Sequence, residues 1–204
     1  MKRLPLAALA AALICTPPVW ADAPAVTTEG QPETGIISRY LLMDFKGRAI
    51  TDQDFPGRFQ LIAFGYTFCP DICPTTLAEM ALIRDKLGDL GGRLQLLFVT
   101  VDPERDTPEV LHRYTEFFDP GIIGLSGSKE LTRSVADHFK VRFEKHWEPS
   151  AAADKYSVDH SAGMYLLGTD GRFIAKFAYI SSSQEIADRI RTLIQETKLR
   201  PSLR

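Results

Sequence analysis

The sequence predicts one α/β domain in which a mixed central sheet is flanked by helices on both faces. Two apolar runs of strand length, residues 59–66 and 94–101, are each followed by a stretch of helical character. Such strand-helix-strand units place their strands in parallel, whereas the later Asp170-Gly171 pair is typical of an antiparallel hairpin. The combination therefore indicates a mixed sheet.

The first strand-helix unit leads into a second buried strand. Residues 59–66 are almost continuously apolar, which predicts a strand buried on both faces. The helix after it repeats apolar residues at steps of three and four, so that they share one face. These residues are Leu77, Met80, Ile83, Leu87 and Leu90. We expect Gly91-Gly92 to end this helix before the strand at 94–101.

The next helix has a recognisable start. In Asp106-Thr107-Pro108-Glu109, Asp106 is the capping candidate, Pro108 suits the first turn, and the acid follows three residues after Asp106. We expect this helix to end near Phe118. A strand at 122–125, a helix at 129–138 and a strand at 141–143 follow.

The last third of the chain changes to a hairpin and a helix. Residues 164–167 and 173–178 form the hairpin strands, with Asp170-Gly171 in the turn. A final amphipathic helix covers residues 183–198. This order of elements is the one seen in thioredoxin-like domains, so we expect a thioredoxin-like fold over residues 39–199.

The N-terminus predicts export. A positively charged start, a mostly apolar stretch to Ile14 and the end Val19-Trp20-Ala21 are typical of a signal peptide, residues 1–21. An uncleaved membrane anchor is the alternative, but prolines interrupt a stretch that would need about 20 apolar residues. A lipid on Cys15 is a further alternative, disfavoured by the bulky Ile14 before it. We therefore expect a periplasmic protein for which a membrane tether is not favoured.

Composition limits the remaining possibilities. Removal of the signal would leave about 183 residues, which suits one domain with a sizeable core. Residues 22–38 resemble a flexible leader in composition, and residues 200–204 form a short C-terminal tail. The formal net charge is only -2, with both signs interspersed, so no nucleic-acid partner is expected.

Two cysteines carry the candidate chemistry. Cleavage after Ala21 would remove Cys15 and leave Cys69 and Cys73, separated by three residues at a strand-to-helix junction. A helix N-terminus stabilises negative charge, so we expect a lowered cysteine pKa there. Residues four apart on a helix have Cβ atoms about 5 to 6 Å apart, wider than the roughly 3.8 Å of a disulfide. The pair therefore suits a metal clamp when reduced and tolerates a disulfide when oxidised.

A third ligand would come from histidine. His160 lies in the segment before the strand at 164–167, and in a thioredoxin-like sheet that segment lies against the cysteine motif. Its neighbour Asp159 could orient the imidazole or serve only the turn. We assign structural roles to the other three histidines, His112, His138 and His146, and to Asp102 and Arg105 near the end of the strand at 94–101.

Three motifs in order resemble the Sco/SenC family of copper proteins. They are Gly65-Tyr66-Thr67-Phe68-Cys69-Pro70-Asp71-Ile72-Cys73-Pro74, Val101-Asp102-Pro103-Glu104-Arg105-Asp106-Thr107-Pro108 and Val158-Asp159-His160-Ser161. The resemblance covers about residues 37–199 and implies copper ligands at Cys69, Cys73 and His160. It also implies a role in assembling the dinuclear copper centre of cytochrome c oxidase. Two thiolates and an imidazole form a soft set suited to Cu(I).

Two functions stay open at this point. A copper metallochaperone would accept copper from a donor protein and pass it to the copper-site subunit of the oxidase. A thiol-disulfide reductase would instead reduce the cysteines of that site through Cys69 or Cys73, with its own supply of thiol reductant. A redox or copper sensor would use the same residues. Whether the protein is an enzyme is thus undecided by the sequence. A thioredoxin carries a cis-proline in the segment before the strand at 164–167, whereas no proline occurs here between Ala151 and Gly163, which favours the chaperone.

Overall fold

A five-stranded mixed sheet forms the centre of the molecule. The computed structural model describes residues 35–147 and 155–199. The sheet has the order β5-β4-β3-β8-β9. Its strands are β3 (Phe59–Gly65), β4 (Leu94–Thr100), β5 (Ile122–Leu125), β8 (Met164–Leu167) and β9 (Phe173–Phe177). β3, β4 and β5 are parallel, while β8 and β9 are antiparallel to their neighbours, so the predicted mixed sheet is confirmed.

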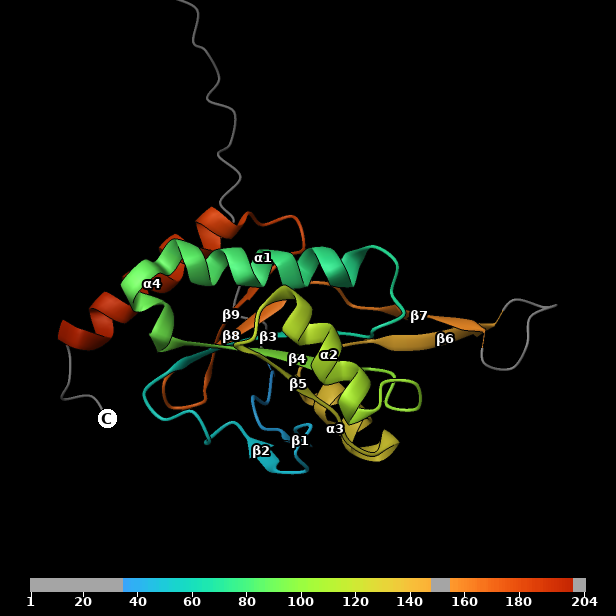
Figure 1. Cartoon of the computed structure of the whole chain (residues 1–204). Coiled ribbons are helices and arrows are strands. Elements are labelled where there is room, and N and C mark those ends of the chain that lie inside the picture. The colour runs from blue at the N-terminus through green and yellow to red at the C-terminus, as the bar shows by residue number, and fades with distance from the viewer. Residues whose placement is uncertain (1–34, 148–154, 200–204) are drawn as a thin grey trace, which may run out of the picture.

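Helices cover both faces of this sheet, as predicted. They are α1 (Ile72–Leu87), α2 (Pro108–Phe118), α3 (Lys129–His138) and α4 (Ser183–Leu199). Figure 1 shows α1 and α4 together on one side and α3 on the other, beside a small hairpin of β1 (Leu41–Met43) and β2 (Ala49–Thr51). The apolar face of α1 is buried, but the α-helix ends at Leu87 and a 3₁₀ turn (Gly88–Arg93) replaces its expected last turn.

A second hairpin projects from the sheet and differs from the expectation. We name it the arm: it consists of β6 (Phe143–Trp147) and β7 (Tyr156–His160), which pair antiparallel. The expected strand at 141–143 is displaced toward the C-terminus, and the strand that ends at His160 was not predicted. Figure 1 shows the arm extending beyond the N-terminal end of α1. The hairpin at Asp170-Gly171 is confirmed, with Gly171 in the left-handed region at φ 76°.

The start of α2 corrects one detail. Thr107, not Asp106, caps this helix, because the Thr107 side chain accepts a hydrogen bond from the amide of Val110. Asp106 is fully buried instead and accepts hydrogen bonds from Thr67 and Thr100. The carboxylate that looked like a cap therefore joins the end of β4 to the loop after β3.

The expected signal and tail, residues 1–21 and 200–204, lie outside the described residues, as does most of the expected leader. Of the leader, Ile36 packs against the core and the Ile37 amide donates to the carbonyl of His138. In residues 35–147 and 155–199, no helix has the length and apolar character needed to cross a bilayer.

The burial of β4 generates a stability prediction. Leu97 is completely buried in the centre of the sheet, whereas Leu82 of α1 is 45% exposed. Leu97→Ala should lower the free energy of unfolding by about 2 to 5 kcal/mol, because it leaves a cavity. Leu82→Ala should change it by no more than about 0.5 kcal/mol. Urea unfolding measures both, and equal losses would contradict the assigned packing.

Candidate metal site

Three potential metal ligands from three segments converge at the carboxyl end of β3. One ligand atom from each of Cys69, Cys73 and His160 lies within 4.8 Å of the others. The Cys73 Sγ and His160 Nε2 atoms are 3.4 Å apart. Both cysteines are free thiols; Cys73 is buried, while Cys69 and His160 are half-buried. The geometry thus brings together all three of the candidate ligands that the sequence indicated.

The two cysteines belong to different local structures. Cys73 is the second residue of α1, and Cys69 lies in the preceding turn, where its amide donates to the carbonyl of Tyr66. Gly65 makes room for this arrangement, since a Cβ atom there would lie 2.5 Å from the Cys73 Sγ. Only a residue without a side chain lets the sulfur lie over the end of β3.

The imidazole of His160 is oriented by the backbone. Its Nδ1 lies 3.2 Å from the carbonyl oxygen of Ser161, which only accepts hydrogen bonds, so Nδ1 donates and Nε2 keeps its lone pair toward Cys73. Asp159 does not orient the ring: its side chain is 79% exposed and lies 3.3 Å from His146. Successive side chains of a strand point to opposite faces, which separates Asp159 from His160.

Burial sets the protonation of the site. It raises the pKa of the Cys73 thiol and lowers the pKa of His160, so both groups favour their neutral forms. The expected lowering of a cysteine pKa by the helix N-terminus is therefore wrong for Cys73, where desolvation outweighs the favourable backbone contact. A metal ion that binds this thiol must displace its proton.

Asp106 fixes the loop that carries Cys69. Its carboxylate accepts from the amide and hydroxyl of Thr67 at 3.1 and 2.6 Å, and from the hydroxyl of Thr100 at 2.6 Å. Burial raises the pKa of Asp106, and these hydrogen bonds oppose that rise. The loop is thereby tied to the end of β4, two residues before Cys69.

A second buried carboxylate fixes the arm that carries His160. Asp102 is fully buried and forms an ion pair with Arg105. It also accepts a hydrogen bond from the Tyr156 hydroxyl at 2.7 Å. Burial raises the pKa of Tyr156 to about 12, and the bond to Asp102 adds to the rise, so the phenol stays protonated near neutral pH. Asp102 and Arg105 thus have the structural role assigned to them, but at the site itself.

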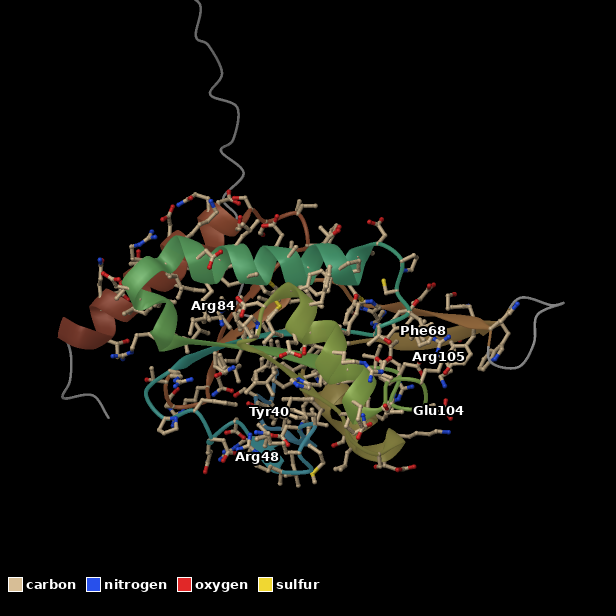
Figure 2. All side chains as sticks on the ribbon, in the orientation of Figure 1. Tyr40, Arg48, Phe68, Arg84, Glu104 and Arg105 are labelled. Atoms are coloured by element: carbon tan, nitrogen blue, oxygen red, sulfur yellow. The ribbon has the colours of Figure 1, made fainter. Side chains whose placement is uncertain are left out.

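Arg105 contacts both ligand-bearing segments. Its guanidinium donates to the Tyr156 carbonyl at 2.9 Å and lies 3.6 Å from the centre of that ring. It also lies 4.8 Å from the centre of the ring of Phe68, the residue before Cys69. Figure 2 shows Phe68 and Arg105 together at the end of the molecule where the arm projects. Tyr156 was not among the predicted site residues, although it alternates with Val158 and His160 in the sequence.

The remaining histidines have the structural roles assigned to them. His112 stacks on the ring of Phe45 at 3.7 Å, the His138 Nδ1 lies 2.9 Å from the carbonyl of Arg39, and His146 pairs with Asp159. In the part of the chain that the structure describes, Cys69, Cys73 and His160 form the one group of three such side chains close enough to share a metal ion.

Fold and site together define a thioredoxin-like protein with a candidate metal site of two thiols and an imidazole. Comparison with protein families agrees with this class: the SCO1/SenC family model matches residues 28–195. The chain belongs to the SCO1/SenC family.

Individual relatives cover most of the chain. Protein sco1 of Schizosaccharomyces pombe is 39% identical over 166 residues, which are 81% of this chain and 62% of that protein. The copper-bound structure of Arabidopsis thaliana ScoI is 33% identical, with a TM-score of 0.72, and covers 79% of this chain and 99% of that one. The copper-bound structure of Bradyrhizobium japonicum ScoI is 36% identical, with a TM-score of 0.68, and covers 76% of this chain and 96% of that one. The chain thus spans about three fifths of the length of the fission yeast relative.

The contacts of Arg105 generate a prediction about the arm. Arg105→Met should lower the hydrogen-exchange protection of the β6 and β7 amides at least about tenfold, because it leaves the buried Asp102 without its guanidinium. Arg84→Met is the matched control, since Arg84 pairs with the buried Asp119 toward the other end of α1 (Figure 2). Exchange measured by mass spectrometry should show the arm-specific loss only for Arg105→Met. Equal protection of the arm in both variants would contradict the assigned anchoring.

Proposed function

We propose that this protein is a copper metallochaperone that binds one copper ion through Cys69, Cys73 and His160. The observation that carries the proposal is the convergence of these three ligand atoms within 4.8 Å of one another. Two sulfur ligands and a neutral imidazole are soft donors, and Cu(I) prefers such a set. The protonation of the site supports this, because burial keeps His160 neutral and its Nε2 available.

Copper fits this donor set better than zinc. Structural zinc normally takes four protein ligands, and among the described residues no fourth histidine, cysteine or carboxylate joins the group. Two members of the same family, the ScoI proteins of Arabidopsis thaliana and Bradyrhizobium japonicum, have structures with copper bound. Metal analysis after purification under reducing conditions should find copper uptake, and tightly held zinc without copper uptake would overturn the assignment.

The copper is passed to the dinuclear copper centre of cytochrome c oxidase, as the family resemblance implies. A three-coordinate ion leaves a position through which a ligand of the oxidase copper-site subunit can enter. Cys69 is the more exposed sulfur, so it is the ligand that the recipient can replace first. A separate copper donor protein loads the site.

The proposal places the protein in the periplasm. The N-terminal pattern supports export and removal of residues 1–21, and in an oxidising compartment the metal-free pair Cys69 and Cys73 can form a disulfide. The folded copper-binding domain covers residues 39–199, after the leader of residues 22–38 and before the tail of residues 200–204.

A thiol-disulfide reductase is the second candidate. The observation that favours it is the asymmetry of the pair. Cys69 is half-buried, whereas Cys73 is only 1% exposed. Such a pair can attack a partner disulfide through the exposed sulfur and release the product through the buried one. The oxidised pair would then need a thiol reductant.

One substitution separates the two candidates. Loss of a residue that only hydrogen-bonds to a metal ligand typically lowers metal affinity about 10- to 100-fold. His160→Ala removes a ligand itself, so it should lower Cu(I) affinity by at least this factor. Competition with a Cu(I) chelator measures this. His146→Ala is the matched control, since His146 lies on the same arm but its side chain pairs with Asp159 on the outer face.

The same two variants are assayed for reduction of an oxidised peptide from the oxidase copper site. Weak copper binding with intact thiol exchange in His160→Ala would mean that both activities exist and are separable. Wild-type copper affinity in His160→Ala would remove His160 from the ligand set and contradict the chaperone proposal.

A further inference from the structure

Exposed apolar side chains lie on two sides of the candidate metal site. Phe68, directly before Cys69, is 61% exposed, and in the turn after β9 Tyr179 and Ile180 are 39% and 89% exposed. Single exposed apolar residues are ordinary on protein surfaces. Two features of these three residues need an explanation: their position near the site, and the fixed orientation of the Phe68 ring.

The turn after β9 lies at the same edge of the sheet as the cysteines. Met164 of β8 pairs with Ala63 near the end of β3, and Phe177 of β9 pairs with Met164. Neighbouring strands lie about 4.8 Å apart, so the end of β9 is about 10 Å from the end of β3. The turn that carries Tyr179 and Ile180 therefore begins about 10 Å from the end of β3, at the edge of the sheet where the ligands meet.

This turn also packs against the segment that leaves His160. Gly163 lies so close to the end of β9 that a Cβ atom there would be 2.5 Å from the carbonyl oxygen of Phe177. The Ser181 amide closes the turn by donating to the carbonyl of Ala178 at 3.0 Å. The turn that carries Tyr179 and Ile180 thus follows directly after the contact with Gly163, three residues from His160, and Phe68 directly precedes Cys69.

Phe68 is exposed but not loosely placed. The guanidinium of Arg105 lies 4.8 Å from the centre of its ring, and that guanidinium is itself held by Asp102 and the carbonyl of Tyr156. Figure 2 shows the two labelled side chains adjacent to each other. An exposed aromatic ring that is already ordered loses little conformational entropy when a partner covers it.

We propose that Phe68, Tyr179 and Ile180, which we name the apolar rim, form the docking surface for the protein that receives copper from this site. The inference rests on the proposed chaperone function and adds the surface through which it acts. The occupant is a folded copper-receiving domain whose own sulfur or imidazole ligands lie within an apolar patch.

The geometry of ligand exchange requires contact at this place. A recipient ligand must come within bonding distance of the metal, about 2.3 Å for sulfur. The recipient's surface then covers the surroundings of the site. A standard interface buries about 800 Å² on each partner, equivalent to a disc of about 16 Å radius. Phe68 is next to Cys69, and the turn with Tyr179 and Ile180 begins about 10 Å from the end of β3, so the rim lies inside that disc.

The chemistry of the rim suits the centre of an interface. Interface centres are enriched in aromatic residues and depleted of charged ones, and ordered aromatic side chains supply most of the binding free energy. Three apolar side chains provide a small contact area, which favours a transient complex that releases its partner after transfer.

The test compares copper transfer to a protein with copper loss to a small molecule. Protein loaded with Cu(I) is mixed with the purified copper-site domain of cytochrome c oxidase, and copper in the separated proteins is followed over time. In parallel, a Cu(I) chelator extracts the metal. Phe68→Ser and Ile180→Ser should each slow transfer to the domain about tenfold or more. Extraction by the chelator should stay within about twofold of wild type for Ile180→Ser, which touches none of the contacts that the structure assigns to the ligands.

Phe117→Ser is the matched control. Phe117 is 83% exposed, but it lies near the far end of α2, about 14 Å along the helix axis from the edge that carries the site. Its substitution should leave both rates at the wild-type value. Ile180→Ser is included as a second rim variant because Phe68 contacts Arg105, so that Phe68→Ser can also act indirectly by loosening the arm.

The outcomes are distinct. Wild-type transfer rates in both Phe68→Ser and Ile180→Ser overturn the docking surface and leave the chaperone function intact. The docking surface is also overturned if, in both variants, the rate of extraction by the chelator changes by as large a factor as the rate of transfer. The substitutions would then act on the metal site itself. If the wild-type protein holds copper but gives none to the oxidase domain, the proposed recipient is wrong and the docking proposal falls with it.

Discussion

Two buried carboxylates at the end of β4 are the constraint on which the candidate site depends. A buried charge is stable only when it is fully paired and hydrogen-bonded. Asp106 has hydrogen bonds alone, from Thr67 and Thr100, whereas Asp102 is paired with Arg105 and hydrogen-bonded to Tyr156. The first set of bonds fixes the cysteine loop and the second fixes the arm. The need to satisfy these two buried carboxylates therefore places ligands that are about 90 residues apart in the sequence.

The two sulfur ligands differ in accessibility because they lie in different local structures. Cys73 lies in the first turn of a helix, against the end of β3, where the missing side chain of Gly65 leaves room for its sulfur. Cys69 lies in the turn that Asp106 anchors through Thr67, and this residue is only half-buried. One rigid, buried ligand and one accessible ligand form a site that can hold an ion and still exchange it.

The sequence predicted the core and the ligands better than what connects them. β3, β4, α1 and α4 were predictable because their burial repeats with the period of a strand or helix. The β1-β2 hairpin and the arm were not, since their strands are short and mostly exposed, as in the Phe143–Trp147 strand. Asp106 was misassigned because adjacent Asp and Thr residues can both cap a helix, and burial decides between them. The contact of Arg105 with Phe68 and Tyr156 depends on tertiary packing, which no local pattern encodes.

Arg105 connects the residues that hold the metal to the surface that contacts the partner. Its guanidinium touches Phe68 on the surface and Tyr156 on the strand that ends at His160. A partner that covers Phe68 removes water from one side of this cation and so strengthens its attraction to the aromatic rings and to Asp102. Covering the rim should then stiffen the base of the arm while leaving Cys69 as the more exposed sulfur. The recipient would thus meet a site in which His160 and Cys73 are held in place and Cys69 is the ligand to be exchanged.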